Sequence, residues 1–339
     1  KMNEMLKYLE DFPVQCEQAV QITKKYPIDV KRYDSIHQVV VCGMGGSAAG
    51  GDLLKSYLQR EANIPIEVNR GYLLPQYVGE NTLVFVISYS GNTEETLSAY
   101  QDALSRSAKI IAITSGGKLK ELCQKDGIDI IEIIGGMPPR ATFGYLFFPM
   151  VTLLERLGLI GSKEEEIRET IQNLQLLCKQ YNPRSKANLA KELSERIKGH
   201  FLLIYAPEHL AACAVRWKNQ FNENSKSIAF FSLLPEMNHN EIEVWASGSE
   251  FTKKFYLIFL RDSAENERIK QRIIITESIL KDKVAGVQHV TSSGKSLLSR
   301  LHSLVYLSDW VSTYLALISS VDPIPTPMID LLKKRLSQL

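Results

Sequence analysis

The sequence is poor in the features that mark secreted, membrane-spanning or metal-binding proteins. Its five cysteines lie far apart with no C-x-x-C pair, which argues against a disulfide framework and against a zinc site. The longest apolar stretch, residues 145–154, contains Pro149 and is shorter than the roughly 18–20 residues that cross a membrane. The first residues form no apolar signal core. We therefore expect a cytoplasmic protein with neither a bound metal nor a membrane partner.

The chain also has almost no excess of charge of either sign. It contains 40 Lys and Arg residues against 38 Asp and Glu residues, a net charge of +2. So small an excess argues against nucleic acid as a partner, and the aromatic residues are too scattered to form a stacking array for bases. The 45% of apolar residues is ordinary for a globular protein, and 339 residues suffice for two domains of roughly 100–200 residues. A soluble chain of this size is typical of an enzyme.

Short β-branched runs alternate with helical stretches in the first half of the chain. Most of these runs are apolar throughout, which is typical of strands buried on both faces of a parallel sheet. The pattern predicts a doubly wound α/β domain. The expected strands are residues 38–42, 64–68, 83–88, 109–113 and 129–133, with helices such as 50–59 and 94–105 between them.

The same order of elements returns in the second half, after a Glu-, Lys- and Leu-rich segment that predicts helices broken at Pro183. A long apolar helix is then stopped by closely spaced prolines, because proline removes a backbone donor. We predict an α/β fold with two doubly wound parallel sheets, each in a three-layer α/β/α sandwich. The expected strands are 201–206, 227–232, 255–260 and 286–290, and the expected final helices are 297–318 and 328–336. The expected divisions are a first domain at 1–160, a helical linker at 161–198 and a second domain at 199–339.

A glycine-rich loop, Gly43-Met-Gly-Gly-Ser-Ala-Ala-Gly-Gly-Asp, follows the first predicted strand. Such a turn between a strand and a helix lets backbone N–H groups approach an anion at the helix N-terminus. One interpretation is a dinucleotide fingerprint with Ala48 in place of the third glycine and Glu67 placed for a ribose contact. Another is a tight turn whose small residues serve packing alone.

A second loop, Ser88-Tyr-Ser-Gly-Asn-Thr-Glu-Glu-Thr, follows the strand at 83–88. Ser88, Ser90 and Thr93 surround a glycine at the start of the next helix. Hydroxyls and backbone amides form a neutral cradle for a terminal phosphate, helped by the helix dipole rather than by lysine. A dinucleotide site has no use for this second cluster, although Ser90 or Thr93 could also be a helix cap. The two loops together favour a phosphosugar site.

These two loops resemble the phosphosugar loops of SIS (sugar isomerase) domains, and the whole chain resembles the bifunctional phosphoglucose/phosphomannose isomerase family. The resemblance implies two SIS domains and an aldose–ketose isomerase of glycolysis and gluconeogenesis, without cofactor or metal. Its substrates would be hexose 6-phosphates: glucose 6-phosphate and also mannose 6-phosphate, converted to fructose 6-phosphate through a cis-enediolate. The further matching motifs, in family order, are Pro138-Pro-Arg, Arg216-Trp-Lys-Asn-Gln-Phe-Asn-Glu-Asn-Ser-Lys, Leu234-Pro-Glu-Met-Asn-His-Asn-Glu-Ile and Val321-Asp-Pro with Ile329-Asp-Leu-Leu-Lys.

The resemblance assigns roles to individual side chains at two places in the site. Glu223 matches the base that moves the proton between C2 and C1, a task suited to a partly buried carboxylate. Arg140 matches the arginine that stabilises the enediolate. The plainer interpretations are a glutamate paired with Lys226 and a surface arginine after a loop. The residues assigned to substrate binding are Gly46, Ser47, Ser88, Ser90, Thr93, Arg140 and Thr326.

The resemblance places ring opening on His239 and Lys333, with His239 reaching the site of the neighbouring subunit in a homodimer. Imidazole suits proton transfer because its pKa lies near neutral pH. The alternatives are a histidine at a helix start, with Asn238 or Asn240 opening a capping box, and an exposed tail lysine. Lys334 is adjacent, and a shift of the match by one residue would give it the role instead. Thr326 is matched to a small residue beside the sugar, or it is an ordinary loop threonine.

Two rival functions stay open at this level. One is a non-catalytic phosphosugar-binding module or sensor, which is expected to lose Glu223 or His239, whereas both are present. The other is a dinucleotide-dependent oxidoreductase. The turn Gly294-Lys-Ser resembles part of a nucleotide P-loop, but the position of the required first glycine is occupied by His289.

Overall fold

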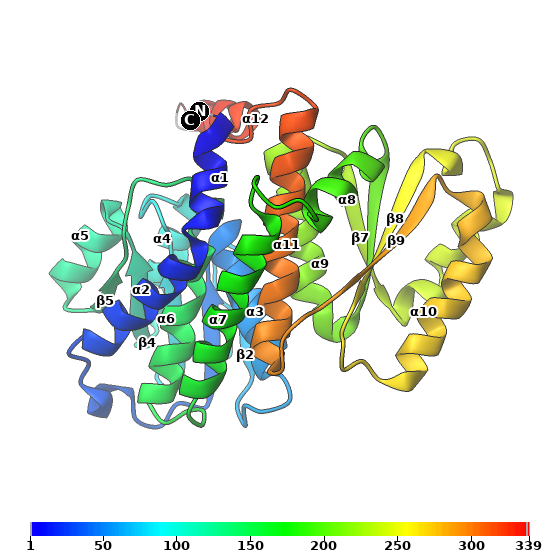
Figure 1. The fold of residues 1–339 in the computed structure, drawn as a ribbon. Coiled ribbons are helices and arrows are strands. Elements are labelled where there is room, and N and C mark those ends of the chain that lie inside the picture. Colours follow the sequence, from blue (N-terminus) through cyan, green and yellow to red (C-terminus); the bar gives the residue numbers. More distant parts are fainter. Residues whose placement is uncertain (1, 337, 339) are drawn as a thin grey trace.

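Two parallel β-sheets carry the fold of this chain, described here as a computed structural model of residues 2–336 and 338. The first sheet has the strand order β2-β1-β3-β4-β5 and the second the order β7-β6-β8-β9. Every strand pairing in both sheets is parallel. The two sheets lie at opposite ends of the molecule with helices between and around them (Figure 1). The predicted α/β class with two parallel sheets is therefore confirmed.

The first sheet reverses its direction of winding between β1 and β3. The chain runs from β1 outward to β2, returns to β3 on the other side, and continues to β4 and β5. Such a switch point opens a crevice at the carboxyl ends of the strands. The strands are β1 Gln38–Cys42, β2 Ile66–Asn69, β3 Thr82–Ile87, β4 Lys109–Thr114 and β5 Asp129–Glu132.

Helices cover both faces of this sheet and bury the apolar strands, as expected for parallel pairing. On one face α3, Gly46–Leu58, and α6, Phe143–Arg156, pack against alternate strand residues. On the other face lie α4, Glu94–Ser105, and α5, Gly117–Asp126. The helix expected at 50–59 begins earlier, at Gly46, because the glycine-rich loop itself winds into the first turn of α3.

The second sheet also has helices on both faces, and α11, Leu297–Ile318, is the central helix on one of them. This helix is buried almost throughout, between α7 and α8 on one side and α9 on the other. α10 covers the opposite face of the sheet. The strands are β6 Phe201–Pro207, β7 Ala229–Leu234, β8 Phe255–Arg261 and β9 Gly286–Thr291. The helices are α7 Glu164–Tyr181, α8 Leu189–Ile197, α9 Ala211–Gln220 and α10 Glu267–Leu280.

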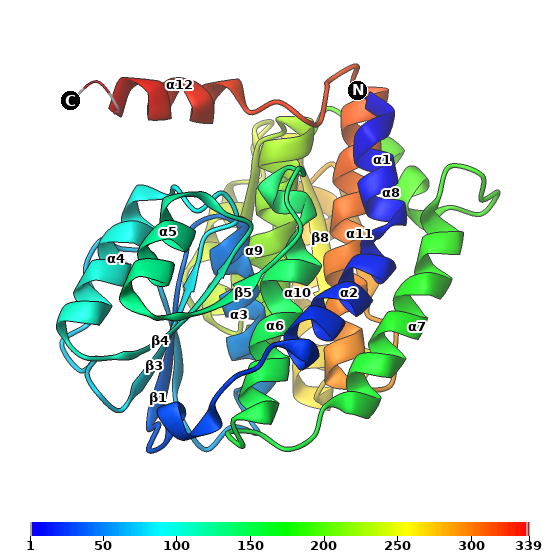
Figure 2. The ribbon, with the colours of Figure 1, turned by 90° about the vertical axis from the view of Figure 1, so that its left-hand side faces the viewer.

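The helices at the two ends of the chain differ in how closely they pack against the rest of the protein. α1, Met2–Glu10, contacts α11, and α2, Phe12–Lys25, packs on α6 and α7. The Tyr306 hydroxyl donates to the Leu9 carbonyl at 2.6 Å. By contrast α12, Pro327–Leu336, has no buried residue and runs from the end of α11 above α4 and α5 (Figure 2). Within residues 2–336 and 338, no helix is both long enough and apolar enough to span a membrane.

Candidate active site

The glycine-rich loop and the hydroxyl loop lie side by side at the switch point of the first sheet. The register pairs Cys42 at the end of β1 with Val86 of β3, so the two loops leave the sheet at the same level. A Cβ atom built on Gly43 would lie 3.1 Å from the Ile87 carbonyl oxygen, which shows how closely they approach. Each loop leads into a helix, α3 or α4. Two helix N-termini, both attractive to an anion, therefore meet in one crevice.

The hydroxyl groups of this crevice bond to each other and to the loop backbone. Ser88 is buried, and its Oγ lies 2.9 Å from Thr93 Oγ1. Ser90 is exposed and accepts from the Asn92 N–H at 3.3 Å, while Ser47 is buried at the start of α3. Thr93 occupies the N-cap position of α4, yet in the described chain its side chain makes no capping bond. The N–H groups of the first turn of α4 have no intrahelical acceptor.

Tyr89 holds a third loop across this edge of the sheet. Its hydroxyl donates to the Ile134 carbonyl at 3.1 Å and accepts from the Met137 N–H at 3.0 Å. This loop follows β5 and carries Arg140 in the short helix η2, Pro139–Ala141. This role of Tyr89 was not predicted from the sequence, although the residue stands inside the hydroxyl loop.

Arg140 is buried beside the glycine-rich loop, with only 5% of its surface exposed. A Cβ atom on Gly46 would lie 3.2 Å from the Pro139 carbonyl oxygen, a tight contact that glycine avoids. The Nε of Arg140 donates to Asn224 Oδ1 at 2.6 Å, and its Nη2 donates to main-chain carbonyls of residues 323 and 324. The remaining arm, Nη1, lies 3.8 Å from Glu223 Oε2. Burial lowers the pKa of Arg140, and the Glu223 carboxylate opposes this shift.

Glu223 lies in a π-helical turn, η4 Phe221–Ser225, directly after α9. Turns of this type are rare and are frequent at functional sites. Its side chain is 28% exposed, so the carboxylate contacts both the buried Arg140 and the solvent. Lys226 does not pair with this carboxylate, because its Nζ donates to the Glu223 carbonyl oxygen at 2.7 Å. The interpretation of the Glu223 carboxylate as an ion-pair partner of Lys226 is therefore wrong.

A buried polar network behind Arg140 fixes its orientation. Asn224, fully buried, accepts from Arg140 and donates through Nδ2 to Ser312 Oγ at 2.9 Å. Arg216 donates to the Arg140 carbonyl at 2.7 Å and forms a two-point ion pair with Asp309 of α11, at 3.0 and 2.9 Å. These roles were not predicted from the sequence. Asp309, the one acidic residue of α11, was the available signal.

Among the described residues, neither His239 nor Lys333 forms a hydrogen bond or ion pair with the residues of this site. His239 ends the short helix η5, Glu236–His239, after β7; it is exposed and makes no hydrogen bond or ion pair within the described part of the chain. Asn240 does cap the next helix by accepting from the Glu241 N–H at 2.6 Å. Neither reciprocal capping box forms among the described residues. The Glu241 carboxylate, the partner expected for Asn238, binds Tyr205 and Ser232 instead, and the Glu243 side chain makes no hydrogen bond to Asn240.

The two C-terminal candidates, Lys333 and Thr326, differ in their surroundings. Lys333 is exposed on α12 and has no ion pair with any residue that the structure describes. Thr326 is half-buried at the start of α12, and its carbonyl accepts from the Asp330 N–H at 3.0 Å. It directly follows the segment whose carbonyls bind Arg140. Over residues 2–336 and 338, no three His, Cys, Asp or Glu side chains gather in a way that could hold a metal ion.

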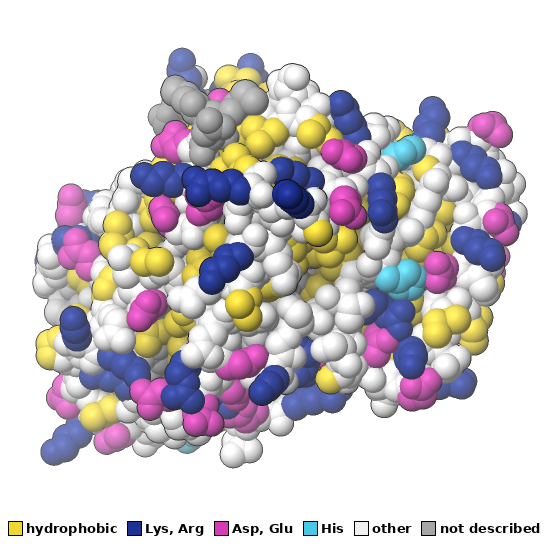
Figure 3. All heavy atoms as spheres, viewed as in Figure 1, with side chains coloured by type: hydrophobic (Ala, Val, Ile, Leu, Met, Phe, Trp, Pro, Cys, Tyr) yellow, Lys and Arg dark blue, Asp and Glu magenta, His cyan; other side chains and the backbone are white. Residues whose placement is uncertain are grey.

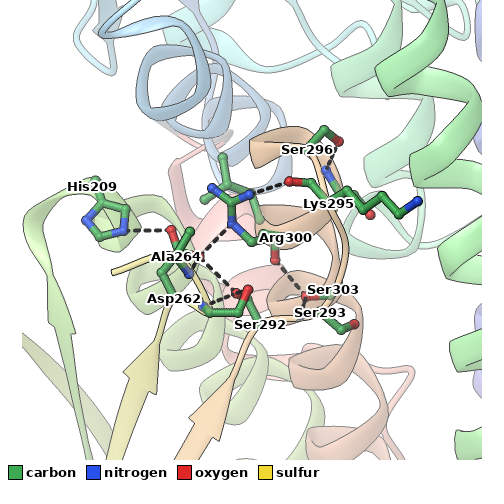
Figure 4. A network of polar contacts seen from close by, with 12 residues as sticks. His209, Asp262, Ala264, Ser292, Ser293, Lys295, Ser296, Arg300 and Ser303 are labelled. Carbon is green, nitrogen blue, oxygen red and sulfur yellow. Dashed lines mark hydrogen bonds and ion pairs between the residues drawn. The ribbon is translucent and has the colours of Figure 1, made fainter. Parts of the chain in front are cut away.

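The corresponding edge of the second sheet carries side chains that bond to one another (Figure 4). Asp262, directly after β8, accepts from Arg300 Nε at 2.6 Å, from Ser292 Oγ at 3.1 Å and from the Ala264 N–H at 3.1 Å. His209 Nε2 lies 3.1 Å from the same carboxylate. Burial alone raises the pKa of Asp262, but these hydrogen bonds and the Arg300 charge outweigh it and hold the pKa well below its usual range.

A second carboxylate closes the start of α11. Glu169 of α7 accepts from the backbone N–H groups of Lys295 at 2.8 Å and Ser296 at 3.1 Å. These are the groups that would bind a phosphate in a nucleotide P-loop. The turn at Gly294 therefore holds an anion supplied by the chain itself, in agreement with the argument from His289.

Known proteins match this chain along its whole length. The SIS domain family matches residues 33–132, and the family described as bacterial phospho-glucose isomerase C-terminal SIS domain matches residues 186–336. A bifunctional phosphoglucose/phosphomannose isomerase of Caldicellulosiruptor bescii is 44% identical over 338 residues, 99% of each chain. The protein of the same description from Aquifex aeolicus is 38% identical over 338 residues, again 99% of each. A hypothetical protein from Thermus thermophilus shares the fold, with a TM-score of 0.76, 14% identity, and coverage of 98% and 90% of the two chains.

Proposed function

Because this chain belongs to the bifunctional phosphoglucose/phosphomannose isomerase family, we propose that it interconverts glucose 6-phosphate and mannose 6-phosphate with fructose 6-phosphate. It is an aldose–ketose isomerase built from two SIS domains, and the resemblance drawn from its motifs is confirmed. The observation that carries the proposal for the site is the position of Glu223. Its carboxylate faces the buried Arg140 guanidinium at 3.8 Å, and Arg140 lies directly beside the phosphate crevice.

The 6-phosphate of the sugar binds in the crevice at the switch point of the first sheet. Its oxygens accept hydrogen bonds from the hydroxyls of Ser47, Ser88, Ser90 and Thr93 and from the N–H groups at the starts of α3 and α4. The convergence of two helix N-termini on uncharged hydroxyls supports this assignment. Gly46 leaves room for the loop of Arg140, so the sugar carbons extend from the phosphate toward Glu223.

Glu223 removes the proton from C2 of the open-chain aldose and returns it to C1. The hydroxyl proton at O2 passes to O1 in the same conversion, so the aldehyde at C1 becomes an alcohol and a ketone forms at C2. Negative charge develops on the two enediolate oxygens. The Nη1 arm of Arg140 stabilises that charge, because Nε and Nη2 are already committed to Asn224 and to main-chain carbonyls.

Ring opening requires groups that this chain does not bring to its own Glu223. We assign them to His239 and Lys333, with His239 contributed by the second subunit of a homodimer. The exposure of His239 supports this arrangement, as does α12, which carries Lys333 and leaves apolar residues such as Met328 and Leu332 exposed. On the face shown in Figure 3, basic and acidic side chains are interspersed, so no patch of one charge there opposes association of two copies.

A coupled assay that starts from fructose 6-phosphate and quantifies both aldose products tests the proposed function. We expect both glucose 6-phosphate and mannose 6-phosphate to form. Binding of phosphosugars without turnover would identify a sensor, and a fluorescence change of added NAD(P)H on binding would favour the oxidoreductase. Formation of glucose 6-phosphate alone would restrict the activity to one aldose.

A further inference from the structure

Residues 321–326, which we call the proline strap, are held against the site by two cations. Nη2 of Arg140 donates to two consecutive carbonyls of the strap, at 2.8 Å to the second of them. Nζ of Lys226 donates to the carbonyls on either side of these two, at 3.2 and 2.9 Å. Proline has no backbone N–H, so the proline-rich strap offers carbonyl groups and few donors. The four carbonyls belong, in order, to Asp322, Pro323, Ile324 and Pro325.

Lys226 also holds the turn that carries Glu223. The same Nζ donates to the Glu223 carbonyl at 2.7 Å and to the Asn224 carbonyl at 3.4 Å. The backbone of Lys226 is in the left-handed conformation, with φ +53°, at the end of the π-helical turn. One ammonium group thus joins the turn of Glu223 to the strap. Lys226 is an exposed residue, and within the described chain its ammonium group bonds to main-chain carbonyls and forms no ion pair with a carboxylate.

We propose that Lys226 is a positioning residue of the isomerase reaction, which sets the distance between Glu223 and Thr326 and thereby the ratio of the two aldose products. The inference rests on the proposed function, in which Glu223 carries the proton. Thr326 follows Pro325, whose carbonyl Lys226 holds, so movement of the strap displaces Thr326 relative to the base. Glucose and mannose 6-phosphates differ only at C2, and the face that is protonated depends on how the C2–C3 bond is oriented against the strap. A misplacement of about 1 Å can cost on the order of 100-fold in rate.

The test compares three variants of the full-length protein with fructose 6-phosphate as substrate. Lys226→Met removes the ammonium group and keeps most of the side-chain length, and Lys226→Arg keeps a donor. Lys198→Met is the matched control, because Lys198 Nζ also donates to a main-chain carbonyl, Ile318 at 2.7 Å, but links no residue of the site. We expect Lys226→Met to lower kcat by roughly 10- to 100-fold, with KM changed less than about 2-fold and an altered ratio of mannose to glucose product. Lys226→Arg should retain most of the kcat and most of the product ratio of the unmodified protein, and Lys198→Met should change neither quantity.

An unchanged kcat and product ratio in Lys226→Met would overturn the positioning role. So would a rise in KM alone, which would make Lys226 a substrate-binding group, and so would equal changes in Lys198→Met, which would make the effect one of general packing. The melting temperature of Lys226→Met shows whether this variant folds. If it does not, Lys226→Gln is measured in its place, and an unchanged product ratio in Lys226→Gln overturns the inference. Failure of the unmodified protein to form either aldose would overturn the proposed function. Normal activity of the unmodified protein, together with an unchanged kcat and product ratio in the Lys226 variants, would overturn only the role of Lys226.

Discussion

The two sheets of this protein have the same strand order at the core, yet among the described residues carboxylates of the chain occupy the backbone donors at the carboxyl edge of the second sheet and not at that of the first. β2-β1-β3-β4 in the first sheet corresponds to β7-β6-β8-β9 in the second. At the first edge, no side chain in the described residues caps the starts of α3 and α4. At the second edge, Asp262 and Glu169 occupy the donors of the loops and of the helix start.

The comparison shows that the fold alone does not make an anion site. A doubly wound sheet creates donors at its carboxyl edge wherever a loop leads into a helix. Whether those donors bind a ligand depends on whether the chain supplies its own carboxylate. In the second domain these donors stabilise the structure, and in the first we propose that the donors without a partner bind the phosphate of the substrate. The predictions below test this difference between the carboxyl edges of the two sheets.

The largest expected effect is on stability, through Asp262→Asn. Removal of one partner from a buried ion-pair cluster leaves Arg300 without a counter-charge and costs about 3–5 kcal/mol. The folded pKa of Asp262 is depressed, so its contribution is present at neutral pH and is lost as pH falls through the ordinary carboxyl value and below. The variant is therefore expected to show a smaller loss of unfolding free energy on acidification. Chemical denaturation at several pH values measures both effects, and equal stabilities at pH 7 would contradict them.

Glu223→Gln is expected to lower kcat on the order of 100-fold or more, because the amide keeps the shape of the carboxylate and loses its basicity. Phosphosugar binding should be retained. The measurement is turnover together with exchange of the C2 proton with solvent. Glu195→Gln, an exposed change on α8, is the control and should leave both rates unaltered. Exchange at the normal rate in Glu223→Gln would transfer the role of base to another residue.

Ser88→Ala tests the open edge directly. Loss of one hydrogen bond to a charged group costs about 1.5–3 kcal/mol, which corresponds to a rise in KM of roughly 10- to 150-fold. Ser292→Ala makes the same change at the closed edge, where the hydroxyl donates to Asp262. It should lower stability and leave KM unaltered. If affinity for a phosphosugar inhibitor is unchanged in Ser88→Ala, the phosphate does not bind where we place it.

Thr326→Gln is expected to act on the choice between the two aldoses more than on overall rate. A longer side chain beside the sugar fills space needed for rotation about C2–C3 and lowers mannose 6-phosphate turnover a few-fold more than glucose 6-phosphate turnover. Initial rates on the two aldoses at saturation measure this. A parallel fall of both rates, or no change in either, would show that Thr326 does not govern the epimer.

The smallest expected effect is that of a chelator. Neither edge gathers three metal-ligating side chains in the described residues, and both anion sites rely on hydroxyls, backbone donors or arginine. Prolonged treatment with EDTA should leave isomerase activity intact within error. Inactivation that is reversed by adding a metal ion would contradict the assignment of the chemistry to Glu223 and Arg140.

The sequence was most informative where structure depends on local pattern. Apolar runs predicted the nine strands of the described residues to within about two residues, and the helices at 94–105 and 297–318 have the expected bounds. The start of α3 was missed because Gly46 and Gly50 are poor helix formers, kept there by close packing against Pro139 and Leu146. No helix was predicted before residue 38, where α1 and α2 are held by partners more than 100 positions away.

In the candidate site, too, local sequence patterns were predictable and long-range contacts were not. The phosphate loops were predicted from residue type and position after a strand, and the roles of Arg140 and Glu223 came from the family motifs. Asn224 and Lys226 lie in those motifs, but their bonding partners are side chains and carbonyls about 80 to 100 residues distant, which spacing does not reveal. The domain limits 1–160, 161–198 and 199–339 and the homodimer stay predictions.

The proline strap has a consequence for the order in which the protein becomes active during synthesis. Arg140 completes its hydrogen bonds with carbonyls 183 and 184 residues further along the chain. Domains fold in order as they leave the ribosome, so the first sheet and its phosphate crevice form well before the strap has been translated. A nascent chain is therefore expected to bind a phosphosugar before it can isomerise one. Ribosome-stalled chains ending before residue 321 should retain a phosphosugar inhibitor and show no turnover.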